Sequence, residues 1–587
     1  MLGDLSPSEI TRIVQESFGR RAMPYLNDEQ VQMRAAEIAR RQGIFERIQR
    51  ELAVGEPIPL LSYSGFREFS RTGNRVNYER LIHRRSGQID LAAMAVYLGV
   101  EGAGTYLADL LWAECESSWW AMPSHEDHAG AIDLRVAMCG FQYAMICQLL
   151  PNRVPIEVRR RLMAEIRRRV LDEYLDPDRF FWWKTFTNNW NAVCNGGVGL
   201  TALLIETDPD RLAAVIRGVL ENLPAFLSGF TADGGCTEGP SYWRYGFSWY
   251  VSFAAALYDF TGGRIDIMAG ERIERICRYP LAMTIAPGQE LMFADVHPGF
   301  LSPAAAIQIN RFHDVPELFG LCRLTERGTL AVGALTDLLL VDESTCEPFA
   351  GRDDYHLPEL GVVKLCCGPV TVGAKAGHNQ EHHNHNDVGS FLVHRGRSFF
   401  LTDLGAPVYS GKTFSPRRYE SIFCNSFGHG VPVVNGRGQE VGGQFAGSLA
   451  LEAGKGGGKK AVRIEMGGAY DDASLKRLTR RIEIGPDGGE LQLADDFAFA
   501  GRPTSVAEAF ITTQPAEAAA DGKSVTIRSE GDGSLELRSA GGGAFEVREL
   551  AEESAAESRS GELVRRIVFT PEAVAEKMTL QFVMRFH

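Results

Sequence analysis

The chain of 587 residues has no apolar run long enough to span a bilayer and no long run of lysine and arginine, and its formal net charge is −14. A membrane-spanning helix needs about 20 consecutive apolar residues, and a nucleic-acid-binding protein normally shows a basic patch. We therefore expect neither membrane insertion nor a nucleic-acid partner.

Two further absences concern the cellular compartment. The first residues contain neither a basic segment nor an apolar stretch of the kind found in signal peptides, and the eleven cysteines include no Cys-x-x-Cys pair. Scattered, odd-numbered cysteines favour free thiols in a reducing compartment. We expect a cytoplasmic protein; a periplasmic or secreted protein is the alternative if a leader preceded this sequence.

The first 350 residues have a helical pattern. Ile156–Tyr174, Asp210–Leu227 and Gly246–Phe260 repeat apolar residues at three- and four-residue spacing, and glycine or proline separates such segments. This pattern predicts an all-helical first domain over residues 1–350.

The remaining residues, 351–587, have short strand-like runs in place of helical periodicity. Gly361–Leu365, Leu478–Ile484 and Glu490–Phe497 are examples, and Gly485–Gly489 has the composition of a hairpin turn. There is no alternation of strands with helices and no phosphate-binding loop, which argues against a nucleotide cofactor. We expect an antiparallel β-sandwich or stacked sheets.

The densest group of histidines lies within residues 378–387. If this segment is a strand, His383 and His385 share a face about 7 Å apart, too far for one metal to take both easily. Further ligands would then come from Asp403 and His429. Two histidines and a carboxylate suit Zn²⁺, with Mn²⁺ as the alternative metal. A solvated polar loop without a metal is the competing interpretation.

Three asparagines, Asn188, Asn189 and Asn191, surround a tryptophan near the middle of the helical half. Asparagine is unfavourable inside a helix, so the cluster favours a cleft wall where amide groups meet a sugar carboxylate. A helix N-cap with internally satisfied amides is an equally good interpretation.

Two other segments combine aromatic, basic and acidic side chains near helix ends, as sugar-binding clefts do. Aromatic core residues are the alternative interpretation. The candidate substrate-binding residues here are Glu238 and Arg244, which flank Tyr242, and Trp119, Trp120 and His125.

Together these segments resemble the heparinase II/III-like polysaccharide lyases, which include alginate and glycosaminoglycan lyases. The resemblance covers most of the chain, and its strongest part is His383-x-His385-x-Asp387, followed by Asp403 and His429. It implies an α + β fold, with an N-terminal (α/α) toroid (an incomplete barrel) followed by antiparallel sheets. It also implies one divalent metal, Zn²⁺, held by His385, Asp403 and His429.

The resemblance further implies β-elimination on an acidic polysaccharide. The family's catalytic tyrosine corresponds to Tyr242, as acid and also as a candidate base, and its cleft histidine corresponds to His383. Arg418 and Tyr419 occupy positions of substrate contacts. Many members have a histidine where this chain has the pair Asn188-Asn189, so an imidazole base from that helix is missing here. The asparagine amides and Arg244 would neutralise the uronate carboxylate.

Two other functions fit the same residues. A glycoside hydrolase on an (α/α) toroid needs two carboxylates across the bond, and the chain offers Glu114, Glu116, Asp233 and Glu238. A non-catalytic carbohydrate-binding protein would use the tryptophans alone. Alginate and glycosaminoglycans are both candidate substrates, and the sequence carries no prediction of oligomeric state.

Overall fold

The computed structural model describes residues 5–125, 132–323, 334–341, 349, 351–454 and 458–587. The chain forms two compact units, each built from three segments. The first comprises Met1–Phe230, Tyr242–Cys277 and Phe300–Ala350, and the second comprises Thr231–Ser241, Arg278–Gly299 and Gly351–His587. Two short segments from the first 350 residues thus belong to the second unit.

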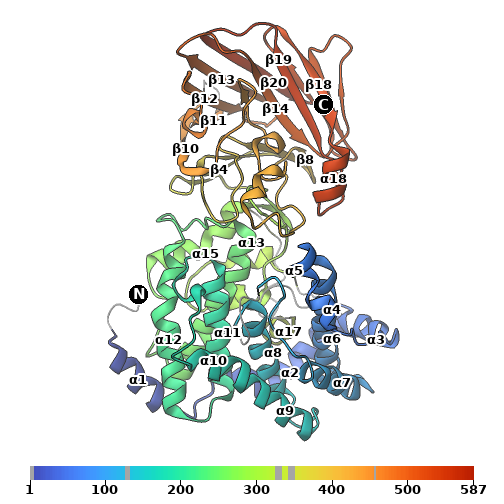
Figure 1. The fold of residues 1–587 in the computed structure, drawn as a ribbon, viewed down its shortest axis with the longest axis vertical. Helices are drawn as coiled ribbons and strands as arrows, with labels where there is room; N and C mark the ends of the chain where they lie inside the picture. Colours follow the sequence, from blue (N-terminus) through green and yellow to red (C-terminus); the bar gives the residue numbers. More distant parts are fainter. Residues whose placement is uncertain (1–4, 126–131, 324–333, 342–348, 350, 455–457) are drawn as a thin grey trace. The chain divides into compact units, whose positions relative to one another are not determined.

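The first unit is helical (Figure 1). Its longer helices are α1 (Pro7–Glu16), α2 (Glu29–Arg41), α3 (Ile44–Ala53), α6 (Val76–Tyr97), α7 (Ala103–Cys115), α8 (Leu134–Leu149), α9 (Ile156–Ile166), α11 (Asn189–Ile205), α12 (Pro209–Ser228), α14 (Ser248–Thr261), α16 (Pro303–Asn310) and α17 (Ala334–Leu340). The shorter ones are α4 (Tyr63–Phe66), α5 (Glu68–Thr72) and α10 (Asp172–Leu175); α13 (Pro240–Tyr242) and α15 (Glu271–Met283) each continue from one unit into the other.

Neighbouring helices pack on one another in a continuous series. Contacts lead from α6 through α7, α9, α8, α11, α14, α16, α17, α2 and α3 back to α6. Helix α11 is buried almost all round because glycines let its neighbours approach closely. A Cβ on Gly197 would lie 2.7 Å from the carbonyl oxygen of Ala137 in α8, and one on Gly196 would lie 2.9 Å from that of Trp249 in α14. Only glycine allows this separation.

The second unit consists mainly of antiparallel strands. A nine-stranded sheet has the order β15-β16-β17-β20-β13-β12-β11-β10-β6, a four-stranded sheet β18-β19-β14-β9, and a five-stranded sheet β3-β4-β5-β7-β8, with β1 and β2 as a separate hairpin. The strands are β1 (Thr284–Ala286), β2 (Gln289–Glu290), β3 (Tyr355–Leu357), β4 (Val362–Cys367), β5 (Val370–Lys375), β6 (Gly377–Asn379), β7 (Phe391–Arg395), β8 (Ser398–Leu401), β9 (Val433–Val434), β10 (Gly442–Ala453), β11 (Lys460–Glu465), β12 (Leu475–Ile484), β13 (Glu490–Phe499), β14 (Val506–Thr512), β15 (Ala516–Ala518), β16 (Ser524–Ser529), β17 (Gly533–Ser539), β18 (Gly543–Glu549), β19 (Arg565–Pro571) and β20 (Lys577–Phe586); one helix, α18 (Ala551–Glu557), precedes β19.

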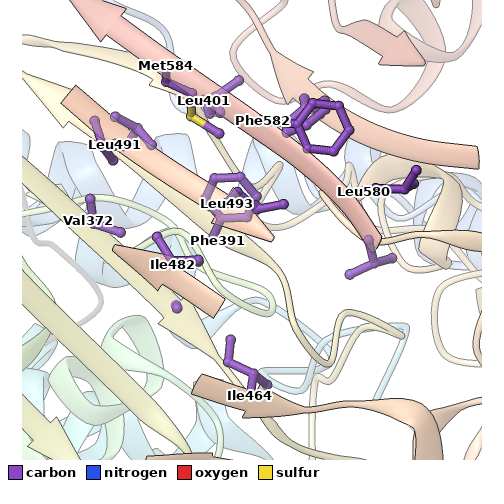
Figure 2. Packing of buried hydrophobic residues seen from close by; sticks show 14 of the residues in the cluster. Val372, Phe391, Leu401, Ile464, Ile482, Leu491, Leu493, Leu580, Phe582 and Met584 are labelled. Atoms are coloured by element: carbon purple, nitrogen blue, oxygen red, sulfur yellow. The ribbon is translucent and has the colours of Figure 1, made fainter. Parts of the chain in front are cut away.

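One large apolar core holds these sheets together. Alternate residues of β13, including Leu491, Leu493 and Phe497, are buried, as expected of strands with one face against a core. Leu493 pairs with Phe582 of β20, and Figure 2 shows both in one cluster with Phe391 of β7, so strands from different sheets contribute to the same core. The sandwich expected from the alternating pattern is therefore present.

Two absences hold for the described residues. All ten cysteines of the described ranges are free thiols, in agreement with the prediction from their spacing. None of the described helices is both long and apolar enough to cross a membrane.

Candidate metal centre and active site

Four buried side chains of the second unit converge on one point. One donor atom from each of His385, Asp387, Asp403 and His429 lies within 4.8 Å of the other three, and the four residues are at most 1% exposed. His385 and Asp387 come from the loop between β6 and β7, and Asp403 closely follows β8. The structure thus brings together the three predicted metal ligands and adds Asp387.

Each of these side chains uses one polar atom within the protein and leaves another without a partner. His385 Nε2 lies 2.9 Å from Asp295 Oδ1, Asp387 Oδ1 lies 2.6 Å from Lys375 Nζ, and His429 Nδ1 lies 2.9 Å from Asp403 Oδ2. Within these four side chains, the buried atoms left without a hydrogen-bond partner in the described structure are His385 Nδ1, Asp387 Oδ2, Asp403 Oδ1 and His429 Nε2.

The surrounding charges shift the pKa values of the candidate ligands in different directions. Burial acts to raise the pKa of Asp403, but His429 holds it below its usual value. Burial lowers the pKa of His385 despite the neighbouring Asp295 carboxylate. Burial acts to lower the pKa of Lys375, but the Asp387 carboxylate raises it. An ionised aspartate and a neutral histidine are the forms that coordinate metals. Burial acts to lower the pKa of His429, but the Asp403 carboxylate raises it, so His429 would release a proton when a metal binds.

The residues fit a divalent metal. A buried donor atom without a partner costs about 1–3 kcal/mol, and a metal would satisfy all four atoms at once. Two imidazole nitrogens and two carboxylate oxygens form a ligand set suited to Zn²⁺. The second partners, Asp295 and Lys375 among them, orient the ligands as outer partners do in metal sites.

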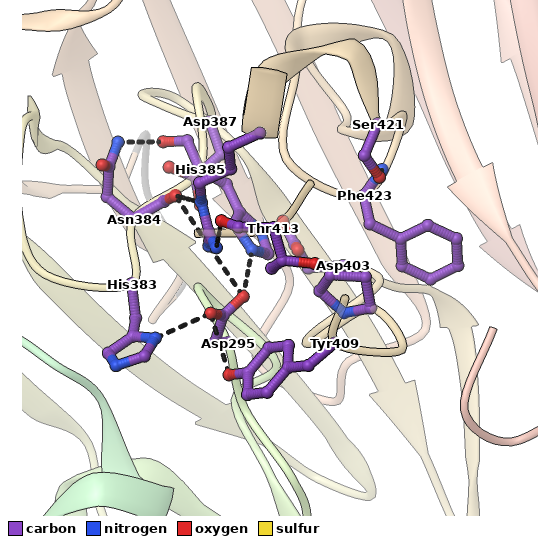
Figure 3. Close-up of polar contacts among 12 residues, drawn as sticks. Asp295, His383, Asn384, His385, Asp387, Asp403, Tyr409, Thr413, Ser421 and Phe423 are labelled. Atoms are coloured by element: carbon purple, nitrogen blue, oxygen red, sulfur yellow. Dashed lines mark hydrogen bonds and ion pairs between the residues drawn. The ribbon is translucent and has the colours of Figure 1, made fainter. Parts of the chain in front are cut away.

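His383 lies beside this group without joining it. Its Nδ1 is 2.8 Å from Asp295 Oδ2, and its Nε2 is 3.8 Å from Glu238 Oε1. Figure 3 shows that His383 and His385 contact different oxygens of the same Asp295 carboxylate. Burial acts to raise the pKa of Asp295, but the hydrogen bonds from both histidines and the charge of Arg418 hold it well below its usual value.

The histidine-rich segment begins in β6, but from residue 380 to 387 it is a loop and not the strand considered from the sequence. His383 has a φ of 60°, in the left-handed region that few residues other than glycine adopt. This conformation breaks the alternation of a strand. Local backbone strain of this kind is found at functional sites, where the surrounding structure holds it.

Arg418 and Tyr419, predicted to contact substrate, contact protein groups next to His383. Arg418 Nη2 lies 2.9 Å from Asp295 Oδ1, and its guanidinium also donates to the carbonyl oxygen of Asn384 at 3.3 Å. The Tyr419 hydroxyl donates to Asn384 Oδ1 at 2.9 Å. Both side chains therefore fix the loop that carries His383 and His385.

The three predicted asparagines lie at the start of α11 in the first unit. Asn188 is the N-cap, and its side chain accepts from the backbone N–H of Trp190. Asn191 is fully buried, and its amide donates to the carbonyl oxygens of Lys184 and Asn222 at 3.0 and 3.1 Å. Asn189 is 2% exposed. The capping interpretation therefore applies to Asn188, and internal hydrogen bonding applies to Asn191.

The segment with two tryptophans also lies in the first unit. Trp120 is buried and donates to the carbonyl oxygen of Glu114, and Trp119 stacks on Phe66 with ring centroids 6.3 Å apart. His125 Nδ1 lies 3.0 Å from Asp133 Oδ2. Trp120 is thus a core residue in this structure, as the alternative interpretation had it.

Tyr242 and Arg244 are partly exposed, whereas Trp243 and Tyr245 between and beside them are buried. The alternation separates two core aromatic residues from two side chains that reach solvent. Ser241, which precedes Tyr242, is tied to the segment that carries Asp295: its hydroxyl donates to the carbonyl oxygen of His297 at 2.9 Å.

Sequence reasoning missed four residues of the second-unit site. Asp387 lay in the quoted motif without a metal role, and nothing singled out Lys375 at the end of β5. Tyr409, whose hydroxyl donates to Asp295 Oδ2 at 2.9 Å, had no motif around it. Asp295 lies 90 residues before His385 and gave no local signal.

Comparison with known proteins finds similarity to polysaccharide lyases. Residues 351–582 match the family model described as Heparinase II/III-like, C-terminal. A crystal structure of heparinase III shares 12% identity at a TM-score of 0.58, covering 97% of this chain and 93% of that one. Heparan sulfate lyase from Pedobacter heparinus shares 11% identity at a TM-score of 0.53, covering 97% of this chain and 92% of that one.

Xanthan lyase from Paenibacillus also has a related fold, with 11% identity and a TM-score of 0.53, covering 99% of this chain and 60% of that one. No protein among those of curated function matches this sequence. Residues 351–582 therefore form a heparinase II/III-like C-terminal domain, and the chain as a whole has the fold of these lyases, an α/α toroid followed by antiparallel sheets, as the sequence predicted.

Proposed function

We propose that this protein is a polysaccharide lyase that cleaves uronate-containing chains by β-elimination. The observation that carries the proposal is the placement of His383, whose imidazole contacts the buried Asp295 carboxylate beside the four candidate metal ligands. These residues lie on a domain similar to the heparinase II/III-like C-terminal domain or next to it. The similar structures bear the names of lyases that act on heparan sulfate and xanthan, both acidic polysaccharides. We extend this class of substrate to the present chain, with glycosaminoglycans first and alginate second.

β-Elimination requires a base at C5 of the uronate, an acid at the leaving oxygen O4, and neutralisation of the carboxylate while charge spreads onto it. We assign the base to His383 and the acid to Tyr242, with Tyr242 as the alternative base. We assign carboxylate neutralisation to Arg244 and Asn189. Asn188 and Asn191, already engaged in the cap and in buried hydrogen bonds, would hold the start of α11 in place.

For the metal, we propose Zn²⁺ with a structural role. His385, Asp387, Asp403 and His429 would hold it, and a site whose four positions are all filled by protein ligands is typical of structural zinc. When bound, the metal would neutralise the two carboxylates and fix the loop on which His383 lies. His383 itself would then move the proton.

A glycoside hydrolase is less well supported because two of its four candidate carboxylates, those of Glu114 and Asp233, are engaged within the protein. Glu114 is fully buried and paired with Arg85 and Arg135. Both carboxylate oxygens of Asp233 accept hydrogen bonds, one from the Thr231 hydroxyl and one from a backbone N–H. A carbohydrate-binding protein without activity would not need the strained, hydrogen-bonded His383.

One assay separates these functions. The protein is incubated with heparan sulfate, hyaluronan, chondroitin, xanthan and alginate, and ultraviolet absorbance and reducing ends are both followed. A lyase produces an unsaturated uronate that absorbs, a hydrolase produces reducing ends alone, and a binder produces neither.

The residue assignments are tested on the substrate that reacts. We expect Tyr242→Phe and His383→Gln each to lower kcat by about 10²–10⁴, the usual contribution of a general acid or base. His378→Ala is the matched control from the same histidine-rich segment. Full activity in Tyr242→Phe would remove Tyr242 from the mechanism.

A further inference from the structure

Asp295 is a fully buried carboxylate that receives four hydrogen-bond donors. Oδ1 lies 2.9 Å from His385 Nε2 and 2.9 Å from Arg418 Nη2, while Oδ2 lies 2.8 Å from His383 Nδ1 and 2.9 Å from the Tyr409 hydroxyl. Two donors on each oxygen fill the accepting positions of an ionised carboxylate. The Asp295 carboxylate therefore has one orientation and can accept no further hydrogen bond.

An ionised carboxylate only accepts hydrogen bonds, so each imidazole nitrogen that faces Asp295 must carry a proton. In a neutral imidazole the lone pair then lies on the other nitrogen. For His385 this is Nδ1, which is one of the four unpartnered atoms of the metal group. For His383 it is Nε2, the nitrogen that faces away from Asp295.

We propose that Asp295 is a positioning residue that sets the tautomers of both histidines in opposite senses. It places the lone pair of His385 on Nδ1, the atom of the metal group, and the lone pair of His383 on Nε2, the nitrogen that lies 3.8 Å from Glu238 Oε1 and would take the substrate proton. The same carboxylate thus couples the metal group to the base. The role of His383 as base rests on the proposed function, whereas the two tautomers do not.

The four donors also predict what a neutral amide would do in this place. Asparagine would present an NH₂ group to two of the donors. The guanidinium of Arg418 cannot give up its proton, so the amide oxygen stays on the side of Arg418 and His385. The NH₂ group then faces Tyr409, whose hydroxyl can rotate, and His383 Nδ1. His383 can accept from it only by moving its proton to Nε2.

Asp295→Asn should therefore reverse the tautomer of His383 and leave the tautomer of His385 unchanged. We expect kcat to fall by about 10³–10⁴, the order seen when a carboxylate that orients a catalytic histidine becomes an amide. KM should stay within about threefold, and the metal content per chain should equal that of the wild type. Tyr409→Phe is the matched control, because it removes one hydrogen-bond donor from Asp295 Oδ2 but leaves that oxygen an acceptor for His383. We expect its kcat to stay within about tenfold of the wild type.

The tautomers are read directly from nitrogen-15 spectra of histidine-labelled full-length protein at a pH where the imidazoles are neutral, with signals assigned through His383→Gln and His385→Gln. We expect wild-type His383 protonated at Nδ1 and Asp295→Asn His383 protonated at Nε2. Wild-type His383 protonated at Nε2 would overturn the proposal, as would a kcat within tenfold of wild type in Asp295→Asn, or loss of its metal.

These readouts separate the inference from the proposed function. If the wild type degrades none of the polysaccharides, the lyase assignment fails, and the spectra and metal content still decide the role of Asp295. If Asp295→Asn does not fold, the wild-type spectra decide it alone.

Discussion

Removal of the metal should destabilise the second unit by an amount that the four unpartnered atoms define. His385 Nδ1, Asp387 Oδ2, Asp403 Oδ1 and His429 Nε2 are buried without hydrogen-bond partners in the described structure. At about 1–3 kcal/mol for each atom, their combined cost is about 4–12 kcal/mol. Water entry and loop relaxation reduce this value, so we expect the lower end.

Calorimetry of the purified protein before and after chelation measures the effect. For a unit of more than 200 residues, 1 kcal/mol shifts Tm by about 2 °C, so the unfolding transition of the second unit should fall by about 8 °C. Added Zn²⁺ should restore it in proportion to the metal bound, because a ligand of the folded state stabilises by mass action.

Two variants make the measurement specific. His429→Ala removes a ligand, so its transition should no longer respond to chelation. His378→Ala removes a histidine of the same segment that lies outside the metal group, so its response should match the wild type. An unchanged Tm after complete metal removal would refute the reasoning, as would purified protein that neither contains nor takes up a divalent metal.

Three further predictions concern packing and buried charge. Gly197→Ala should lower the free energy of unfolding by about 1–3 kcal/mol because the added Cβ would overlap a carbonyl group of α8. Gly104→Ala is the control: the nearest atom to its added Cβ would be 3.9 Å away, so this variant should be neutral or stabilising. Urea unfolding of both variants measures the difference. Burial raises the pKa of Asp337 to about 6 from 3.8, so between these pH values folding takes up a proton. The free energy of unfolding therefore falls as pH rises through this window. Asp337→Asn should remove this pH dependence and stabilise the protein at neutral pH by about 3 kcal/mol, measured by thermal melts. A steeper loss of stability with pH in that variant would contradict the assignment. Lys375→Met should lower the free energy of unfolding by about 3–5 kcal/mol, because it leaves the buried Asp387 carboxylate without its cation. Denaturant unfolding should show a smaller loss when Zn²⁺ is present. Equal losses with and without the metal would count against the metal site.

The metal ligands could be predicted because they lie in local patterns. His385, Asp403 and His429 each occupy a short motif, and the resemblance gave each a role. The same approach could not find Asp295, since its importance comes from side chains up to 123 residues later in the chain. Hydrogen bonds between residues so far apart in the chain produce no recognisable pattern in the residues next to Asp295.

The helical half shows a different limit. Residues of the cluster from Asn188 to Asn191 look alike in sequence, yet one caps a helix and another binds two backbone carbonyls. An amide side chain serves a cleft, a cap or a buried network equally well. Only the direction in which each side chain leaves the helix separates these roles, and that direction depends on where α11 begins.

The discontinuous second unit has a consequence for how the chain matures. Asp295 leaves the ribosome 90 residues before His385, with helices of the first unit synthesised in between. Its carboxylate stays hydrated until residues 383–418 supply its donors, because domains fold as units. A fragment beginning at Gly351 would lack both Asp295 and Glu238. Any shortened version of this protein that is meant to keep its histidine site intact must therefore retain the earlier segments.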